Sequence, residues 1–117
     1  MATKSDGFDQ ARGWSRNIRR MVENLTQDTL DELLESPLGI ETRSDWVTYG
    51  EVFEPAEYRI YLCAGGPAVR LTGEMDIGGC PESVIMEYLD SFTPWMEYLL
   101  DENEEEDCLT YARQFFV

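Results

Sequence analysis

The sequence contains no histidine, and its only lysine is Lys4, close to the N-terminus. Histidine is the commonest general base and metal ligand in proteins, and it activates most serine and cysteine nucleophiles. Carboxylate pairs remain open, for instance Glu74 with Asp76 or Glu87 with Asp90, although a chain with 24 acidic residues brings some together by chance. The sequence therefore predicts a protein that is not an enzyme and that uses no cofactor and no metal.

Long apolar runs are also missing from the sequence. No window approaches the roughly 18 consecutive apolar residues of a membrane-spanning helix, and the N-terminus lacks the apolar core and cleavage site of a secretory signal. We therefore expect a cytoplasmic protein that does not bind membranes. Only three cysteines occur, at Cys63, Cys80 and Cys108, and their spacing does not suit a metal site. In a reducing compartment we expect all three to be free thiols.

Cations are scarce, with nine against 24 acidic residues and a formal net charge of −15. Five of the nine lie within residues 1–20, so residues 21–117 are still more acidic than the whole. Such a surface repels nucleic acid and attracts cationic surfaces, including the nucleic-acid-binding grooves of other proteins. We expect a partner protein with a surface of that kind and no direct binding to nucleic acid. Solubility alone is the other explanation for the charge.

The length of 117 residues and the hydrophobic content of 43% indicate one folded domain with a single core. We expect residues 1–7 to be frayed, 8–36 to be helical, 38–100 to form a sheet and 103–116 to form a last helix. The fold class predicted is α+β, with N-terminal helices, a four-stranded antiparallel meander and a C-terminal helix.

The helical segments are predicted from apolar periodicity and from their ends. Apolar residues recur at spacings of three, four and seven between Phe8 and Leu25, which is typical of an amphipathic helix. Thr26 is placed to cap a second helix, which Pro37 ends, and Asn103 is placed to cap the last one.

Four arginines share another face of the first predicted helix: Arg12, Arg16, Arg19 and Arg20. They could dock a partner, or they could pair with the protein's own carboxylates. The second explanation is favoured, because an acidic body needs counter-charge and this helix is its main source.

Runs rich in β-branched and aromatic residues at 58–63, 68–76 and 82–90 are separated by turns containing glycine and proline. This pattern predicts three consecutive antiparallel strands. Residues 38–49 are expected to add a strand before them, with a bulge or bend at 44–45. Several of these strands are apolar on both faces, which predicts cover on the second face as well.

Arg70 lies in the middle of an apolar strand, where an arginine is usually paired across the sheet. Glu87 on the next strand is its expected partner, and a role in recognition is the alternative. Trp46, Phe92 and Trp95 are expected at one end of the sheet, either in the core or, if exposed, as anchors of an interface. The residues after Trp95 could add a short last strand.

Two short motifs, Gly-Gly-Pro-Ala-Val-Arg at 65–70 and Thr-Pro-Trp at 93–95, are fairly specific in combination. With them, residues 36–116 resemble an uncharacterised family of small acidic proteins associated with phages, plasmids and integrated elements of bacteria. The chain departs from the family at Leu89, where a glutamine is usual, and at Ser91, where a tryptophan is usual. The other matching stretches are Ser36-Pro37-Leu38, Arg43-Ser44 with Trp46, Cys63, Gly73-Glu74 with Asp76, Glu87-Tyr88 with Asp90, and Tyr111-Ala112-Arg113-Gln114-Phe115. The resemblance implies a mobile element as the setting, and no chemistry.

Two functions fit these observations. The first is a mobile-element protein that inhibits a host defence complex, of the anti-CRISPR or anti-restriction type, with carboxylates in place of nucleic-acid phosphates. The second is an interaction or regulatory module that acts independently of net charge, with a homodimer through a sheet edge or the arginine face as one option. The carboxylates predicted to form the acidic surface are Glu102, Glu104, Glu105, Glu106 and Asp107, with Asp28, Asp31, Glu32 and Glu35 as a second ribbon.

Phosphate mimicry needs acidic side chains in rows, about 6–7 Å apart, close to a two-residue step of an extended chain. The sequence shows an abundance of acidic residues but does not reveal rows.

Overall fold

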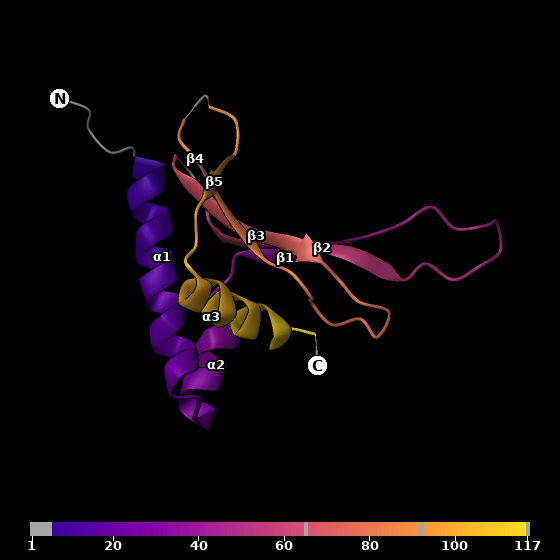
Figure 1. The fold of residues 1–117 in the computed structure, drawn as a ribbon, viewed down its shortest axis with the longest axis horizontal. Helices are drawn as coiled ribbons and strands as arrows, with labels where there is room; N and C mark the ends of the chain where they lie inside the picture. Colours follow the sequence, from indigo (N-terminus) through magenta and orange to yellow (C-terminus); the bar gives the residue numbers. More distant parts are fainter. Residues whose placement is uncertain (1–5, 65, 92, 117) are drawn as a thin grey trace.

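The computed structural model describes residues 6–64, 66–91 and 93–116. Helices lie at both ends of this part of the chain, and strands lie between them (Figure 1). In chain order the elements are α1 (Asp6–Glu23), α2 (Gln27–Glu35), β1 (Gly39–Ser44), β2 (Pro55–Cys63), β3 (Ala68–Glu74), β4 (Ile85–Leu89), β5 (Met96–Tyr98) and α3 (Glu102–Arg113).

The strands form one sheet in the order β1-β2-β3-β4-β5, and every neighbouring pair is antiparallel. The predicted α+β class and the meander are therefore confirmed. The sheet has five strands rather than the expected four, because β5 pairs with β4 through three residues from Met96 to Tyr98. Within the described residues, no helix is long and apolar enough to cross a bilayer.

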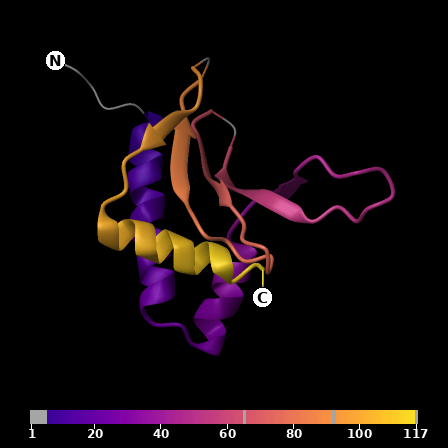
Figure 2. The ribbon, with the colours of Figure 1, turned by 45° about the vertical axis from the view of Figure 1, so that its right-hand side comes forward.

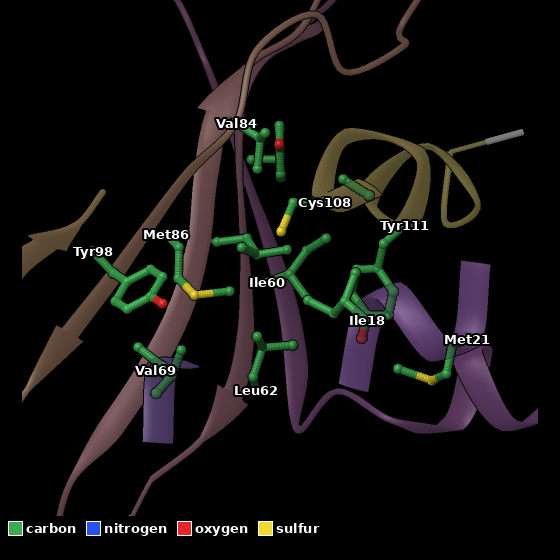
Figure 3. Packing of buried hydrophobic residues seen from close by; sticks show 14 of the residues in the cluster. Ile18, Met21, Ile60, Leu62, Val69, Val84, Met86, Tyr98, Cys108 and Tyr111 are labelled. Atoms are coloured by element: carbon green, nitrogen blue, oxygen red, sulfur yellow. The ribbon is translucent and has the colours of Figure 1, made fainter. Parts of the chain in front are cut away.

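One face of the sheet forms the core against the helices (Figures 1 and 3). α1 packs on β3 and β4, and α3 packs against α1. A row of directly paired side chains crosses the sheet on this face, and its central members Ile60, Leu71 and Met86 have no exposed surface. Burying each contributes about 1.5–3 kcal/mol to stability. The fully or almost fully buried side chains include Ile18, Met21, Leu33, Tyr58, Ile60, Leu62, Val69, Leu71, Met86, Cys108 and Tyr111.

The two shorter helices begin with complete capping boxes. The Thr26 hydroxyl accepts from the Thr29 N–H at 3.3 Å, and the Thr29 hydroxyl accepts from the Thr26 N–H at 2.6 Å, so the predicted cap of α2 is confirmed. α3 is capped by Asp101 rather than by Asn103. The Asp101 carboxylate accepts from the Glu104 N–H at 2.8 Å, and the Glu104 carboxylate accepts from the Asp101 N–H at 3.1 Å, so the cap lies two residues before the expected one.

α1 begins at Asp6, two residues before the expected start of the helical segment. The Gly7 N–H donates to the Asp90 carboxylate at 2.7 Å, which ties the first turn to the end of β4. A Cβ at Gly7 would lie 2.8 Å from the carbonyl oxygen of Leu89, so this close approach requires glycine. Residues 1–5, which were also expected to be frayed, lie outside the described residues.

The segment after β1 departs most from the sequence prediction. Residues 46–49 were expected to continue the strand, but the pairing with β2 shifts register at Arg43 and Ser44 and then ends. Residues 45–54 form a loop that projects away from the rest of the molecule (Figures 1 and 2). The chain turns back where the Glu51 N–H donates to the Thr48 carbonyl at 2.9 Å, with Gly50 at a φ of 94°. We call residues 45–54 the projecting loop.

Candidate protein-binding surfaces

The four predicted acidic residues of α2 lie on one side of that helix. Asp28, Asp31 and Glu35 follow one another at i, i+3 and i+7, all three are exposed, and the buried Leu33 points the opposite way. Helical rise places them about 5 and 6 Å apart along the axis. The sequence showed only an abundance of acidic residues, and the helix arranges these three as a short row.

The fourth, Glu32, is exposed and paired with α1. Its Oε1 lies 2.6 Å from Arg20 Nη2, and this hydrogen bond holds the pKa of the Glu32 carboxyl below its usual value.

The five predicted acidic residues of α3 divide into two groups. Glu102, Glu105 and Glu106 are exposed around the first turns of the helix, where carboxylates are favoured by the helix dipole. Glu104 and Asp107 are half-buried and turn toward α1. The Glu104 Oε2 accepts from the Ser15 hydroxyl at 2.5 Å, while its Oε1 completes the capping box. Glu104 therefore stabilises the fold and is not available as a contact.

Asp107 lies 3.9 Å from Arg19, measured from Oδ2 to Nε. Burial raises the pKa of the Asp107 carboxyl, Arg19 lowers it, and the neighbouring Glu106 raises it again, with a net shift upward. Its contribution to an acidic surface is weaker than that of its exposed neighbours.

The arginine face of α1 pairs with the protein's own carboxylates, as the sequence predicted, at three of its four positions. Arg12 pairs with Asp9 at 3.1 Å, and Arg19 and Arg20 make the two contacts described above. In the part of the chain that the structure describes, Arg16 makes no ion pair. Arg19 and Arg20 thus link α1 to α3 and to α2, and the exposed carboxylates lie on the outer sides of those two helices.

Arg70 pairs with Glu87 across β3 and β4, as predicted. The Arg70 Nε donates to Glu87 Oε1 at 2.8 Å, and the two side chains are 11% and 23% exposed. The Trp95 ring lies over the guanidinium, with 3.9 Å from Cζ to the ring centroid. This stack lies on the face of the sheet opposite the helices, where Trp95 supplies part of the cover that was expected on the second face.

The predicted cluster of Trp46 with Trp95 is wrong. In a meander the β1–β2 and β4–β5 connections lie at opposite ends of the sheet, so Trp46 and Trp95 are separated by its length. Phe92, the third expected member, lies outside the described residues.

Trp46 instead belongs to the projecting loop, where large apolar side chains face solvent. Trp46 and Tyr49 are 103% and 102% exposed, and Val52 and Phe53 are 80% and 74% exposed. Consecutive residues of the loop enclose an open hollow of about 970 Å³ beside Trp46, Tyr49 and Phe53. The sequence predicted that residues 46–49 would continue a strand. A usable signal was present in its apolar residues: Trp46, Tyr49 and Phe53 stand at i, i+3 and i+7, a spacing that does not suit a strand.

The β3–β4 connection lies at the same end of the sheet and places Ile77 at its tip, 99% exposed. The turn is fixed by Asp76, whose carboxylate accepts from the Cys80 N–H at 3.0 Å and whose carbonyl accepts from the Gly79 N–H at 3.0 Å. A second hollow of about 500 Å³ lies between this turn and the projecting loop, beside Val52 and Ile77.

All three cysteines are free thiols, as expected. Cys108 is buried in the core, and burial raises the pKa of its thiol to about 12. Such a thiol remains protonated and is a poor nucleophile at neutral pH. Among the described residues, no group of acidic residues and cysteines has an arrangement that could hold a metal ion.

Comparisons of the chain with family models, with curated proteins and with solved structures found no match.

Proposed function

We propose that the protein is a non-enzymatic inhibitor that binds the cationic, nucleic-acid-binding surface of another protein through the outer faces of α2 and α3. The observation that carries the proposal is the exposed row Asp28, Asp31 and Glu35, together with the exposed carboxylates of Glu102 and Glu106. In the described part of the chain none of these five is held in an ion pair, and Asp31 accepts one hydrogen bond, from Gln27 Nε2 at 3.1 Å, so their charges are available to a cationic partner. The axial spacing in the α2 row is close to that required of a phosphate mimic.

The mechanism is occupation of the partner's site by carboxylates in place of phosphates. Long-range attraction steers the encounter and weakens as salt screens it. The resemblance to proteins of phages and plasmids favours a host defence complex, of the anti-CRISPR or anti-restriction type, as the target. On this proposal the protein does not bind nucleic acid itself, because a net charge of −15 repels it.

Capture from a lysate of the source cells, with washes at low and then high salt, tests the proposal. A nucleic-acid-handling complex should be retained at low salt and released at high salt. The triple variant Asp28→Asn, Asp31→Asn and Glu35→Gln should retain much less of it. A control of equal charge change, Glu41→Gln, Glu74→Gln and Glu82→Gln, neutralises three exposed carboxylates outside the helices and should bind almost as the parent does.

Two results would contradict the proposal. One is the absence of a nucleic-acid-handling partner from the captured proteins. The other is an equal loss of binding in both triple variants, which would indicate a response to net charge without a defined surface.

A further inference from the structure

The projecting loop and the β3–β4 turn expose five large apolar side chains at one end of the sheet. They are Trp46, Tyr49, Val52, Phe53 and Ile77. Exposed apolar residues scattered singly over a protein surface are ordinary, but a group of them on adjacent elements marks an interaction site. None of the five belongs to the core cluster, so the fold does not account for them.

Hydrogen bonds define the backbone of both turns, so the positions from which the side chains extend are set before binding. Gly50 adopts the positive φ that the third position of a type II turn requires, and the Thr48 carbonyl closes that turn. The hydrogen bonds of Asp76 close the other turn. Val52 and Ile77 border the hollow between the turns, and Trp46, Tyr49 and Phe53 border the hollow of the loop. The two turns therefore lie next to each other across the second hollow, and between them they carry all five side chains.

The charge around these side chains narrows the class of partner. Asp45, Glu51, Glu54 and Asp76 border the two hollows, and Arg43, the one cation among the described residues that also borders them, is paired with Glu57. An anionic membrane or a nucleic acid would be repelled, although aromatic side chains can stack on bases. A second copy of this chain would be repelled as well, because it would bring the same four carboxylates and a net charge of −15 to the contact.

We infer that the projecting loop and Ile77 dock into an apolar pocket on a partner protein, and that lysine and arginine side chains line the rim of this pocket. Trp46 and Tyr49 are the anchors, because buried tryptophan and tyrosine contribute most to interfaces of this kind. The four carboxylates contact the cationic rim and set the orientation of docking.

This surface is distinct from the one proposed above. The projecting loop extends along the long axis of the molecule, at the other end from α2 and α3 (Figure 1). The inference therefore does not rest on the acidic helices, and the two surfaces respond differently to salt. Contacts of α2 and α3 weaken as salt rises, whereas burial of Trp46 and Tyr49 persists at high salt.

Photo-crosslinking with the full-length protein tests the inference. A photoreactive benzoylphenylalanine replaces Trp46 in one variant and Ile77 in another, and it replaces the exposed Gln10 of α1 in the control. Each variant is irradiated in a lysate of the source cells, and the joined peptides are identified by mass spectrometry. Positions 46 and 77 should join to the same protein, at apolar segments flanked by lysine or arginine, and position 10 should not.

The partner identified in this way is then purified and titrated at 50 and 500 mM salt. The double variant Trp46→Ser and Tyr49→Ser should bind at least tenfold more weakly at both concentrations, while the control Thr48→Ser in the same turn should bind as the parent does. Thermal unfolding of each variant shows that the fold is intact.

Four outcomes overturn the inference: no crosslink, a crosslink to a second copy of the chain, a joined peptide without neighbouring cations, or unchanged affinity of the double variant. The proposed function fails by different results, namely the absence of a nucleic-acid-handling partner or an equal loss of binding in the α2 triple variant and its charge-matched control. Each proposal can therefore fail while the other stands.

Discussion

The pair of Arg70 and Glu87 shows how one charged residue is accommodated within a sheet. Arg70 lies between apolar neighbours on β3, and its guanidinium is enclosed by the Glu87 carboxylate and by the Trp95 ring. A half-buried charge without a partner costs more than an exposed one, because it loses water without gaining a hydrogen bond. The arginine is therefore explained by structural pairing, as the sequence predicted.

Replacing Glu87 with glutamine should lower the free energy of unfolding by about 1–3 kcal/mol, because the largely enclosed guanidinium of Arg70 loses its counter-charge. Urea denaturation measures the change. The matched control is Glu57→Gln, which disrupts the more exposed pair with Arg43 in the same sheet and should cost less than about 0.5 kcal/mol. Equal losses in the two variants would show that Trp95 does not shield the Arg70 pair.

Asp107 should produce a stability effect that depends on pH. Burial raises its pKa in the folded protein, with further upward contributions from Glu106, Glu23 and Asp101 and a downward one from Arg19. The charged form is therefore disfavoured in the folded state, and this penalty acts at any pH above the folded pKa. It disappears as the pH falls below the unfolded pKa, where the carboxyl is neutral in both states.

The variant Asp107→Asn should accordingly be more stable than the parent at neutral pH, and the difference should vanish in acid. Thermal unfolding of both proteins across the pH range measures it. A variant that is less stable at neutral pH would mean that the contact with Arg19 outweighs the effect of burial.

At the scale of elements, much of the fold could be predicted because period-two alternation identifies strands buried on one face. Alternation places Tyr58, Ile60 and Leu62 on one face of their strand, and all three are buried. The projecting loop could not be predicted in this way. Trp46 and Val47 have high strand propensity, but β1 loses its partner after Ser44, and propensity cannot show whether a partner strand continues.

The candidate sites were predicted less completely than the fold. The acidic residues of α2 and α3 were named, but their number gave no indication that Glu104 turns inward while Glu102 faces solvent. That difference depends on where α1 packs and on which residue caps α3, because the Glu104 carboxylate accepts from the Ser15 hydroxyl of α1 and from the N–H of the cap Asp101. Similarly, the exposure of Trp46 results from the path of the chain and not from its neighbours in sequence.

Gly73 on β3 tests the account of sheet packing. A Cβ at this position would clash with the carbonyl oxygen of Ser83 and would lie 2.9 Å from the Tyr58 ring, whose hydroxyl donates to the same carbonyl. The variant Gly73→Ala should lower the free energy of unfolding by about 3 kcal/mol. Gly39→Ala on β1 is the control, because a Cβ there meets nothing within 4 Å, and its effect should stay within about 1 kcal/mol. A mild effect at Gly73 would show that β3 and the Ser83 segment are less closely packed.

At the scale of the whole molecule, charge and shape divide the surface into two regions. The molecule extends over 56 × 37 × 26 Å, with the acidic outer sides of α2 and α3 at one end and the projecting loop at the other. Three of the four arginines of α1 form ion pairs within the protein, so they do not offset the exposed carboxylates of α2 and α3. This arrangement suits a protein that approaches a cationic partner by long-range attraction.

The measurement that tests the central claim most directly is the salt dependence of affinity for the captured partner. The logarithm of affinity is plotted against the logarithm of salt concentration for the parent, for the triple variant at Asp28, Asp31 and Glu35, and for the control at Glu41, Glu74 and Glu82. Binding by phosphate mimicry predicts a steep slope for the parent, a clearly shallower one for the α2 variant and little change for the control. A parent affinity that does not vary with salt, or equal slopes for the two triple variants, would contradict the account.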